Sequence, residues 1–142
     1  MSCASVLFGS EFSAADVIKT RASNGLLTME IEVGTVCNFL CRYCYVGDCH
    51  AQAPGDRHEL TPEELRDVVA QAQALGARKI ILLGGEPMLY DFTPALCGWI
   101  RGRGMAVELF TNGSNMTPEL AAKLFGMGVH VVLKWHSSDH RV

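Results

Sequence analysis

Residues 61–83 read TPEELRDVVAQAQALGARKIILL, and this stretch decides the fold class. Thr61 can cap a helix, Pro62 suits its first turn, and Glu64 completes a capping box with the threonine. Gly76 stands where such a helix would end. The apolar residues between these signals recur at helical spacing and form one face: Leu65, Val68, Val69, Ala72 and Leu75. The stretch therefore predicts an amphipathic helix that leads into a short strand at 79–83.

The same alternation of short apolar runs and helical stretches fills the rest of the chain. Strands are expected at 26–33, 79–83, 106–110 and 129–135, and further helices near 94–102 and 118–125. Residues 11–24 are expected to form an irregular or helical lead-in. Strand, helix and strand at short intervals are typical of βαβ units. We therefore expect an α/β fold with a parallel sheet of about four strands and covering helices.

The composition excludes several classes of protein. The chain has 142 residues, of which 49% are hydrophobic and 19% charged, and its net charge is −3 at pH 7. This charge is too small to indicate binding to nucleic acid or to a membrane surface. No apolar run approaches the roughly 18–20 residues of a spanning helix, and residues 1–10 lack the features of a secretory signal. A cytoplasmic location is expected, so the six cysteines indicate metal or redox chemistry rather than a disulfide framework.

A long segment between the first expected strand and the helix at 61 carries Cys37, Cys41, Cys44 and Cys49. Long segments after parallel strands usually carry function, because sites in such folds collect at the carboxyl ends of the strands. Thiolates are soft ligands that suit zinc or an iron–sulfur centre. A closed zinc site needs four protein ligands, and Cys49 or His50 would supply the fourth. The first three cysteines alone would instead leave a four-iron cube with one iron free to bind a substrate or cofactor.

The spacing C-x3-C-x2-C of Cys37, Cys41 and Cys44 resembles the signature of the radical S-adenosylmethionine (SAM) superfamily, including the aromatic Tyr43 before the last cysteine. Three further segments extend the resemblance: GGEP at 84–87, TNG at 111–113 and KWHSSD at 134–139.

Each of these segments alone is compatible with an ordinary strand-end turn, but their joint placement at the ends of expected parallel strands gives them weight. The resemblance covers residues 28–139. It makes these residues candidate SAM contacts: Tyr43, Gly84, Gly85, Glu86, Thr111, Asn112, Lys134 and Ser137.

The resemblance implies a chemistry. Cys37, Cys41 and Cys44 would hold a [4Fe–4S] cluster whose fourth iron binds SAM. One electron from a flavodoxin or ferredoxin would then cleave SAM to methionine and a 5′-deoxyadenosyl radical, which would abstract a hydrogen atom from the substrate. Similar cysteine loops occur in members that modify peptides or proteins and in a molybdenum-cofactor branch that acts on a nucleotide. We favour a peptide or protein substrate over a small molecule.

The resemblance also implies a domain organisation, with residues 1–25 as a lead-in and 26–142 as the N-terminal part of a radical SAM core. The family barrel has six strands, and the sequence supplies about four before Val142. The expected fold is therefore a partial (β/α) barrel, and a truncated product or fragment is expected. Two other hypotheses stay open, a non-catalytic zinc-binding module and an inactive truncated chain.

Several polar residues fall within the expected strands: Glu30, Glu32, Glu108, His130 and Lys134. They would line a polar substrate chamber in a closed barrel. We favour internal ion pairing or solvent exposure instead, because unpaired buried charges are costly. Cys97 lies in an expected helix and is interpreted as a buried structural thiol.

Overall fold

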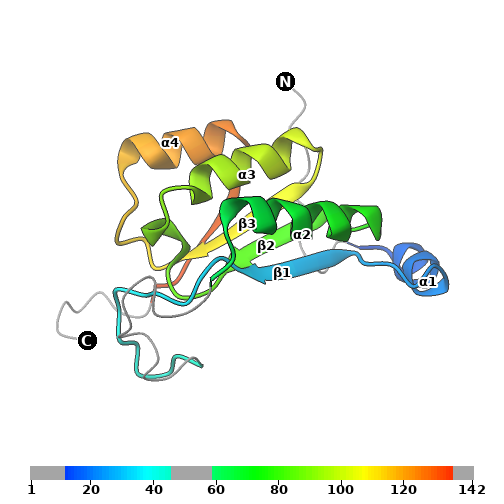
Figure 1. Cartoon of the computed structure of the whole chain (residues 1–142), viewed down its shortest axis with the longest axis horizontal. Coiled ribbons are helices and arrows are strands. Elements are labelled where there is room, and N and C mark those ends of the chain that lie inside the picture. Colours follow the sequence, from blue (N-terminus) through cyan, green and yellow to red (C-terminus); the bar gives the residue numbers. More distant parts are fainter. Residues whose placement is uncertain (1–11, 46–58, 136–142) are drawn as a thin grey trace.

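The computed structural model describes residues 12–45 and 59–135 and contains one parallel sheet with helices on one face (Figure 1). The sheet order is β1-β2-β3-β4, and every neighbouring pair of strands is parallel. The elements are α1 (Ala14–Ala22), β1 (Thr28–Glu32), α2 (Pro62–Ala74), β2 (Lys79–Leu83), the 3-10 helix η3 (Pro87–Leu89), α3 (Thr93–Gly102), β3 (Ala106–Thr111), α4 (Pro118–Gly126) and β4 (His130–Leu133). The expected α/β fold with four parallel strands is confirmed.

Helix α2 begins with the capping box that the sequence predicts. The Thr61 hydroxyl accepts a hydrogen bond from the Glu64 N–H at 3.2 Å, and the Glu64 carboxylate accepts one from the Thr61 N–H at 2.8 Å. This capping box satisfies two N–H groups that the first turn would otherwise leave without partners. Leu65, Val69 and Ala72 on the inward face are buried.

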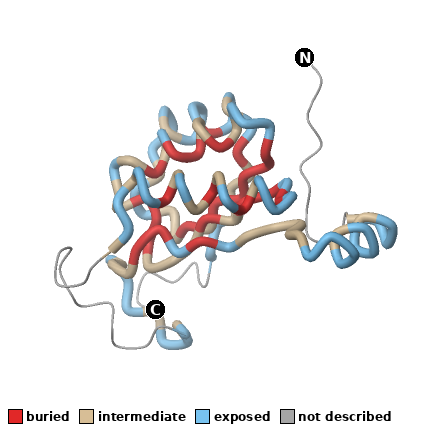
Figure 2. Tube along the Cα trace, turned by 45° about the vertical axis from the view of Figure 1, so that its right-hand side comes forward, coloured by how far each residue is buried: buried red, intermediate tan, exposed pale blue. Residues whose placement is uncertain are grey.

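The hydrophobic core lies between the sheet and helices α2, α3 and α4, as the buried segments in Figure 2 show. Alternate strand residues point into it, because successive side chains of a strand face opposite sides of the sheet. The core residues of the strands and of the facing helices include Ile31, Ile80, Leu82, Val107, Leu109, Leu65, Val69, Leu96, Ile100 and Leu124. Cys97 is also fully buried in this core, which agrees with its interpretation as a structural thiol.

The other face of the sheet carries polar and aromatic residues and no described helix. One row across all four strands consists of Glu30, Ile81, Glu108 and His130, which are paired in register. Two residues further along, the same face carries Glu32, Leu83, Phe110 and Val132. These two rows of side chains extend along the helix-free face of the sheet to the carboxyl ends of the strands.

Helix α1 lies at the opposite end of the sheet from the segment that follows β1 (Figure 1). Arg78, just before β2, links the helix to the sheet through an ion pair with Asp16 at 2.9 Å and a stacking contact over the Phe12 ring at 4.9 Å. The lead-in is thus helical over Ala14–Ala22. No helix in the described ranges has the length and apolar character needed to cross a membrane.

The boundaries of some elements differ from the sequence prediction. The 3-10 turn η3 was not expected, and it forms because Glu86 caps it by accepting a hydrogen bond from the Met88 N–H. Strand β4 ends at Leu133 instead of residue 135, and β1 begins at Thr28 instead of residue 26. Leu26 leaves the sheet because its N–H donates to the carbonyl of Leu75 at the end of α2.

Candidate functional site

A cavity of about 640 Å³ opens at the carboxyl ends of the strands. Its walls are the helix-free face of the sheet and the segment 34–45 after β1, which we call the cysteine loop. The cavity brings together every predicted site residue that the structure describes: Cys37, Cys41, Tyr43, Cys44, Gly84, Gly85, Glu86, Thr111, Asn112 and Lys134. Ser137, Cys49 and His50 lie outside the described residues. Parallel strands place their carboxyl ends at one edge, and this explains why segments far apart in sequence meet here.

The three cysteines of the loop are half-buried and face this cavity. The Phe39 N–H contacts the Cys37 sulfur at 3.5 Å, and the Cys44 N–H donates to the Cys41 carbonyl at 3.0 Å. Burial raises the pKa of the Cys41 thiol, and the neighbouring Cys37 and Cys44 thiols raise it further. A bound metal centre would favour the thiolate form of Cys41, because a nearby positive charge stabilises the ionised sulfur.

Three thiols that face one cavity are a donor set that suits an iron–sulfur cluster and, with a fourth protein ligand, zinc. In a tetrahedral zinc site with Zn–S bonds of about 2.3 Å, the sulfurs lie only about 3.8 Å apart. Within residues 12–45 and 59–135, no three His, Cys, Asp or Glu side chains are arranged to hold one metal ion. A cube of four irons takes each thiolate on a different iron, so its three cysteine sulfurs are spread more widely around a shared cavity.

The glycines of the GGEP segment allow the cysteine loop to approach the end of β2. The Gly85 N–H donates to the Gly34 carbonyl at 2.9 Å, and the Glu86 N–H donates to the Val36 carbonyl at 2.8 Å. A Cβ on Gly84 would collide with the Gly34 carbonyl, and one on Gly85 would collide with the Val36 carbonyl. Gly84 also has φ +134°, which side chains rarely tolerate. The sequence made Gly84 and Gly85 candidate SAM contacts. The structure shows that both glycines are also needed for the cysteine loop to pack against the end of β2.

Glu86 connects the end of β2 to the end of β3. Its side chain is 1% exposed. Oε1 accepts hydrogen bonds from the Met88 N–H at 2.9 Å and the Thr111 hydroxyl at 2.6 Å, and Oε2 accepts one from the Asn112 N–H at 2.6 Å. These three donors compensate the carboxylate for the loss of water. Because a carboxylate oxygen has two lone pairs, Oε2 keeps room for one further donor, such as a ligand ammonium.

Asn38 links the cysteine loop to the segment after β3, a role that sequence reasoning missed. The Asn112 amide donates to the Asn38 side-chain oxygen at 2.9 Å, and the Asn38 amide donates to the Ser114 hydroxyl at 2.8 Å. Asn112 therefore contacts the cysteine loop as well as the cavity. A polar asparagine directly after the first cysteine was the only sequence signal for this contact.

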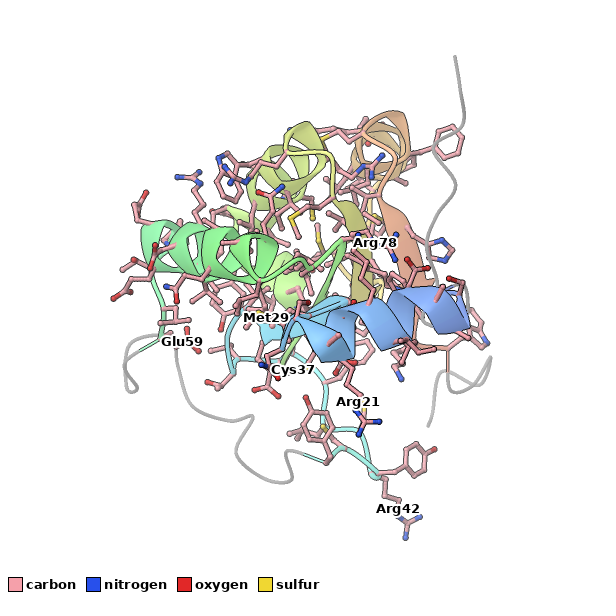
Figure 3. All side chains as sticks on the ribbon, turned by 90° about the vertical axis from the view of Figure 1, so that its right-hand side faces the viewer. Arg21, Met29, Cys37, Arg42, Glu59 and Arg78 are labelled. Carbon is pink, nitrogen blue, oxygen red and sulfur yellow. The ribbon has the colours of Figure 1, made fainter. Side chains whose placement is uncertain are left out.

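The end of the cysteine loop is attached to β1. The Tyr45 hydroxyl donates to Glu32 Oε1 at 2.8 Å. Burial, together with the hydrogen bond to Glu32 and nearby negative charge, raises the pKa of Tyr45 to about 12. Between these attachments the loop projects away from the sheet, with Arg42 at its tip (Figure 3).

Of the polar residues of the sheet face, Glu108 is ion-paired as we favoured, whereas Glu30, Glu32 and Lys134 line the cavity, as the polar-chamber alternative implied. Glu108 forms an ion pair with Lys79 at 2.6 Å, and the two side chains are 10% and 2% exposed. Glu30 and Glu32 are exposed and line the cavity, as does Lys134 on β4's carboxyl side. The Lys134 ammonium lies 5.4 Å from the centroid of the Phe110 ring, a cation–π contact. Lys79 as the partner of Glu108 was not predicted.

Comparison with known proteins assigns the family. The family model of the Radical SAM superfamily matches residues 31–142, a range that includes the cysteine loop and all the strand ends around the cavity. The chain belongs to the radical SAM superfamily. Enzymes of this family use a [4Fe–4S] cluster and SAM as cofactors.

The curated relatives act on different substrates. The chain is 30% identical to the S-adenosylmethionine-dependent nucleotide dehydratase of a Thermoplasmatales archaeon, over 87% of this chain and 40% of that protein. It is 35% identical to the PqqA peptide cyclase of Streptomyces rochei, over 78% of this chain and 30% of that protein. The chain therefore spans well under half the length of these radical SAM relatives.

Solved structures show the same fold. Streptococcus suis SuiB bound to S-adenosylmethionine matches with a TM-score of 0.66 at 19% identity, over 88% of this chain and 28% of that one. BtrN in complex with AdoMet and 2-DOIA matches with a TM-score of 0.63 at 21% identity, over 80% of this chain and 48% of that one. At these identities the likeness concerns the fold alone, and it confirms the partial radical SAM barrel that the sequence predicts.

Proposed function

We propose that Cys37, Cys41 and Cys44 hold a [4Fe–4S] cluster and that the cavity at the strand ends binds SAM beside it. The observation that carries this proposal is the convergence of three half-buried thiols and the GGEP and TNG segments on one cavity. When bound, the two cofactors supply reductive cleavage of SAM and hydrogen-atom abstraction from a substrate. Electrons would come from a flavodoxin or ferredoxin.

The chain's own residues bind and orient SAM in this proposal. Gly84, Gly85 and Glu86 line the part of the cavity where the SAM ammonium would bind, and the Glu86 carboxylate would accept a hydrogen bond from it. Thr111 and Asn112 line the next part of the wall, and Lys134 offers a positive charge to a carboxylate. The apolar side chains of Ile81, Leu83 and Phe110 would cover the adenosyl group and exclude water. Tyr43 and Ser137 complete the proposed contacts.

The test uses the chain purified without oxygen and reconstituted with iron and sulfide. We expect about four irons per chain, an electron paramagnetic resonance (EPR) signal on reduction, and a change in that signal when SAM is added. Cys41→Ala should lose the cluster, whereas Cys97→Ala should keep it, because Cys97 is buried in the core. Full iron content and SAM cleavage in Cys41→Ala would refute the ligand assignment.

A zinc site is the second candidate, and the same preparation decides it. A colourless chain with one tightly bound zinc would support a closed site completed by Cys49 or His50. Among the described side chains no three are arranged to hold one ion, and Cys49 and His50 lie outside the described residues, so the metal content of the preparation decides between the two readings.

For the substrate we favour a peptide or protein. Support comes from relatives whose names describe peptide chemistry, namely the PqqA peptide cyclase and SuiB, which was solved bound to its precursor peptide SuiA. Relatives named GTP 3′,8-cyclase and nucleotide dehydratase support a nucleotide instead. A synthetic peptide library and GTP, added separately to the reduced, SAM-loaded protein, distinguish these classes. Stimulation of 5′-deoxyadenosine formation by GTP alone would overturn the peptide proposal.

A further inference from the structure

The backbone just before Cys37 is held on two sides. On one side, the Gly34 and Val36 carbonyls accept hydrogen bonds from the N–H groups of Gly85 and Glu86. On the other side, the Thr35 and Val36 N–H groups donate to side chains that come from distant parts of the chain. The Thr35 N–H donates to Glu59 Oε1 at 2.7 Å, and the Val36 N–H donates to the Tyr90 hydroxyl at 3.1 Å.

These two side chains also bind each other. The Tyr90 hydroxyl donates to Glu59 Oε1 at 2.9 Å, and the Thr35 hydroxyl donates to the same oxygen at 2.8 Å. We call Thr35, Glu59 and Tyr90 the loop-base cluster. In the sequence, Glu59 lies just before helix α2, which begins at Pro62, whereas Thr35 lies just before the first cysteine. The loop-base cluster therefore joins the beginning and the end of the segment that carries the cysteines.

Gly34 and the ionisation state of Glu59 both favour the hydrogen bonds of the loop-base cluster. A Cβ on Gly34 would collide with the hydroxyl of Tyr90, so the glycine is what lets the phenol reach the backbone. Burial opposes ionisation of Glu59, but the hydrogen bonds from Thr35 and Tyr90 outweigh it, so the pKa of Glu59 lies below its usual value. An ionised carboxylate makes stronger hydrogen bonds to these donors than a neutral acid would.

We propose that Glu59 and Tyr90 are positioning residues for Cys37: they fix the two residues that precede this ligand and so hold its thiol in place for the cluster. The inference rests on the proposed function, since it treats Cys37 as a cluster ligand. Neither residue lines the cavity, so their effect on the cofactors would pass through the backbone of the cysteine loop.

The first test needs no cofactor. In the metal-free full chain, amide hydrogen exchange at Thr35 and Val36 reports directly on the two N–H groups that the loop-base cluster binds. Tyr90→Phe should speed exchange at Val36 by about tenfold, because the hydrogen bond to the phenol is lost. Thr93→Val is the matched control, since it removes a buried hydroxyl hydrogen bond of 2.7 Å to Pro87 in the same part of the chain. Unchanged exchange at Val36 in Tyr90→Phe would overturn the proposal.

The second test measures the cluster. In the reconstituted protein, Tyr90→Phe should lose iron to a chelator about tenfold faster than the wild type and shift the EPR g values, while Thr93→Val should match the wild type. Glu59→Gln keeps one acceptor oxygen, so its rate of iron loss should fall between those of the wild type and Glu59→Ala. Wild-type rates and g values in both Tyr90→Phe and Glu59→Ala would refute the link to Cys37.

The two proposals fail in different ways. A wild-type chain that takes up a single zinc and forms no iron–sulfur cluster would refute the proposed function. The exchange rates would still decide whether Glu59 and Tyr90 hold the segment before Cys37, because that experiment uses metal-free protein.

Discussion

Replacing Glu86 by glutamine should destabilise the protein even before any cofactor binds. The Met88 N–H donates to Oε1, and the Asn112 N–H donates to Oε2, so the two backbone donors use different oxygens of the carboxylate. A glutamine has one oxygen and therefore satisfies only one of these donors, while its NH₂ group faces the other donor. The Thr111 hydroxyl can rotate to accept a hydrogen bond from the new amide, but a backbone N–H can only donate. One of the two backbone N–H groups therefore still lacks an acceptor.

The magnitude follows from burial. Glu86 is 1% exposed, so water cannot replace the lost partner. A buried N–H without an acceptor costs about 2 kcal/mol in the free energy of unfolding. For a chain of this size, that corresponds to a fall in Tm of about 8 °C.

The assay is thermal unfolding of the metal-free protein, followed by circular dichroism. Glu63→Gln is the control, because Glu63 is 77% exposed and its 3.4 Å contact with Arg66 is a surface pair that should contribute little. A fall in Tm of less than about 2 °C in Glu86→Gln would refute the reasoning, since it would mean that neither backbone donor depends on the carboxylate.

Two further predictions concern other ionised groups. Lys79→Met should lower the free energy of unfolding by about 3 kcal/mol, because it leaves the buried Glu108 side chain without its ion-pair partner. In urea unfolding, adding Glu108→Leu should restore much of this loss. A double variant no more stable than the single variant would contradict this prediction. Because hydrogen bonds hold the folded pKa of Glu59 below its ordinary value of 4.5, its stabilisation is present above pH 4.5 and is lost as the pH falls through the folded pKa. Between pH 6 and pH 3, the free energy of unfolding should therefore fall less steeply for Glu59→Gln than for the wild type. An equal fall in both proteins would argue against an ionised Glu59.

The sequence predicted those parts of the fold that depend on local signals. The capping box of Thr61 and Glu64 and the apolar face of α2 located that helix to within a residue or two. Strand β2 matches its predicted range, residues 79–83. Strand ends were less predictable, because Leu26 leaves the sheet through a hydrogen bond to Leu75, a residue that only the folded chain brings close.

The candidate site was also only partly predictable from the sequence. Motif spacing identified the cysteines and the GGEP and TNG segments, and the parallel topology then explains why they meet. The side chains that attach the cysteine loop were not predicted, because Asn38, Glu59 and Tyr90 find their partners across large sequence separations. The proposed roles of the site residues and the domain boundary at residue 26 stay predictions.

The close backbone contact between the cysteine loop and the GGEP segment restricts how this scaffold can be re-engineered. Transplanting a cysteine loop from another protein would succeed only if the donor also supplied glycine at position 34 and carbonyls spaced to meet the Gly85 and Glu86 N–H groups. The cysteine loop and the GGEP segment are thus a single exchangeable unit, and a chimera that divides them should misfold at their junction.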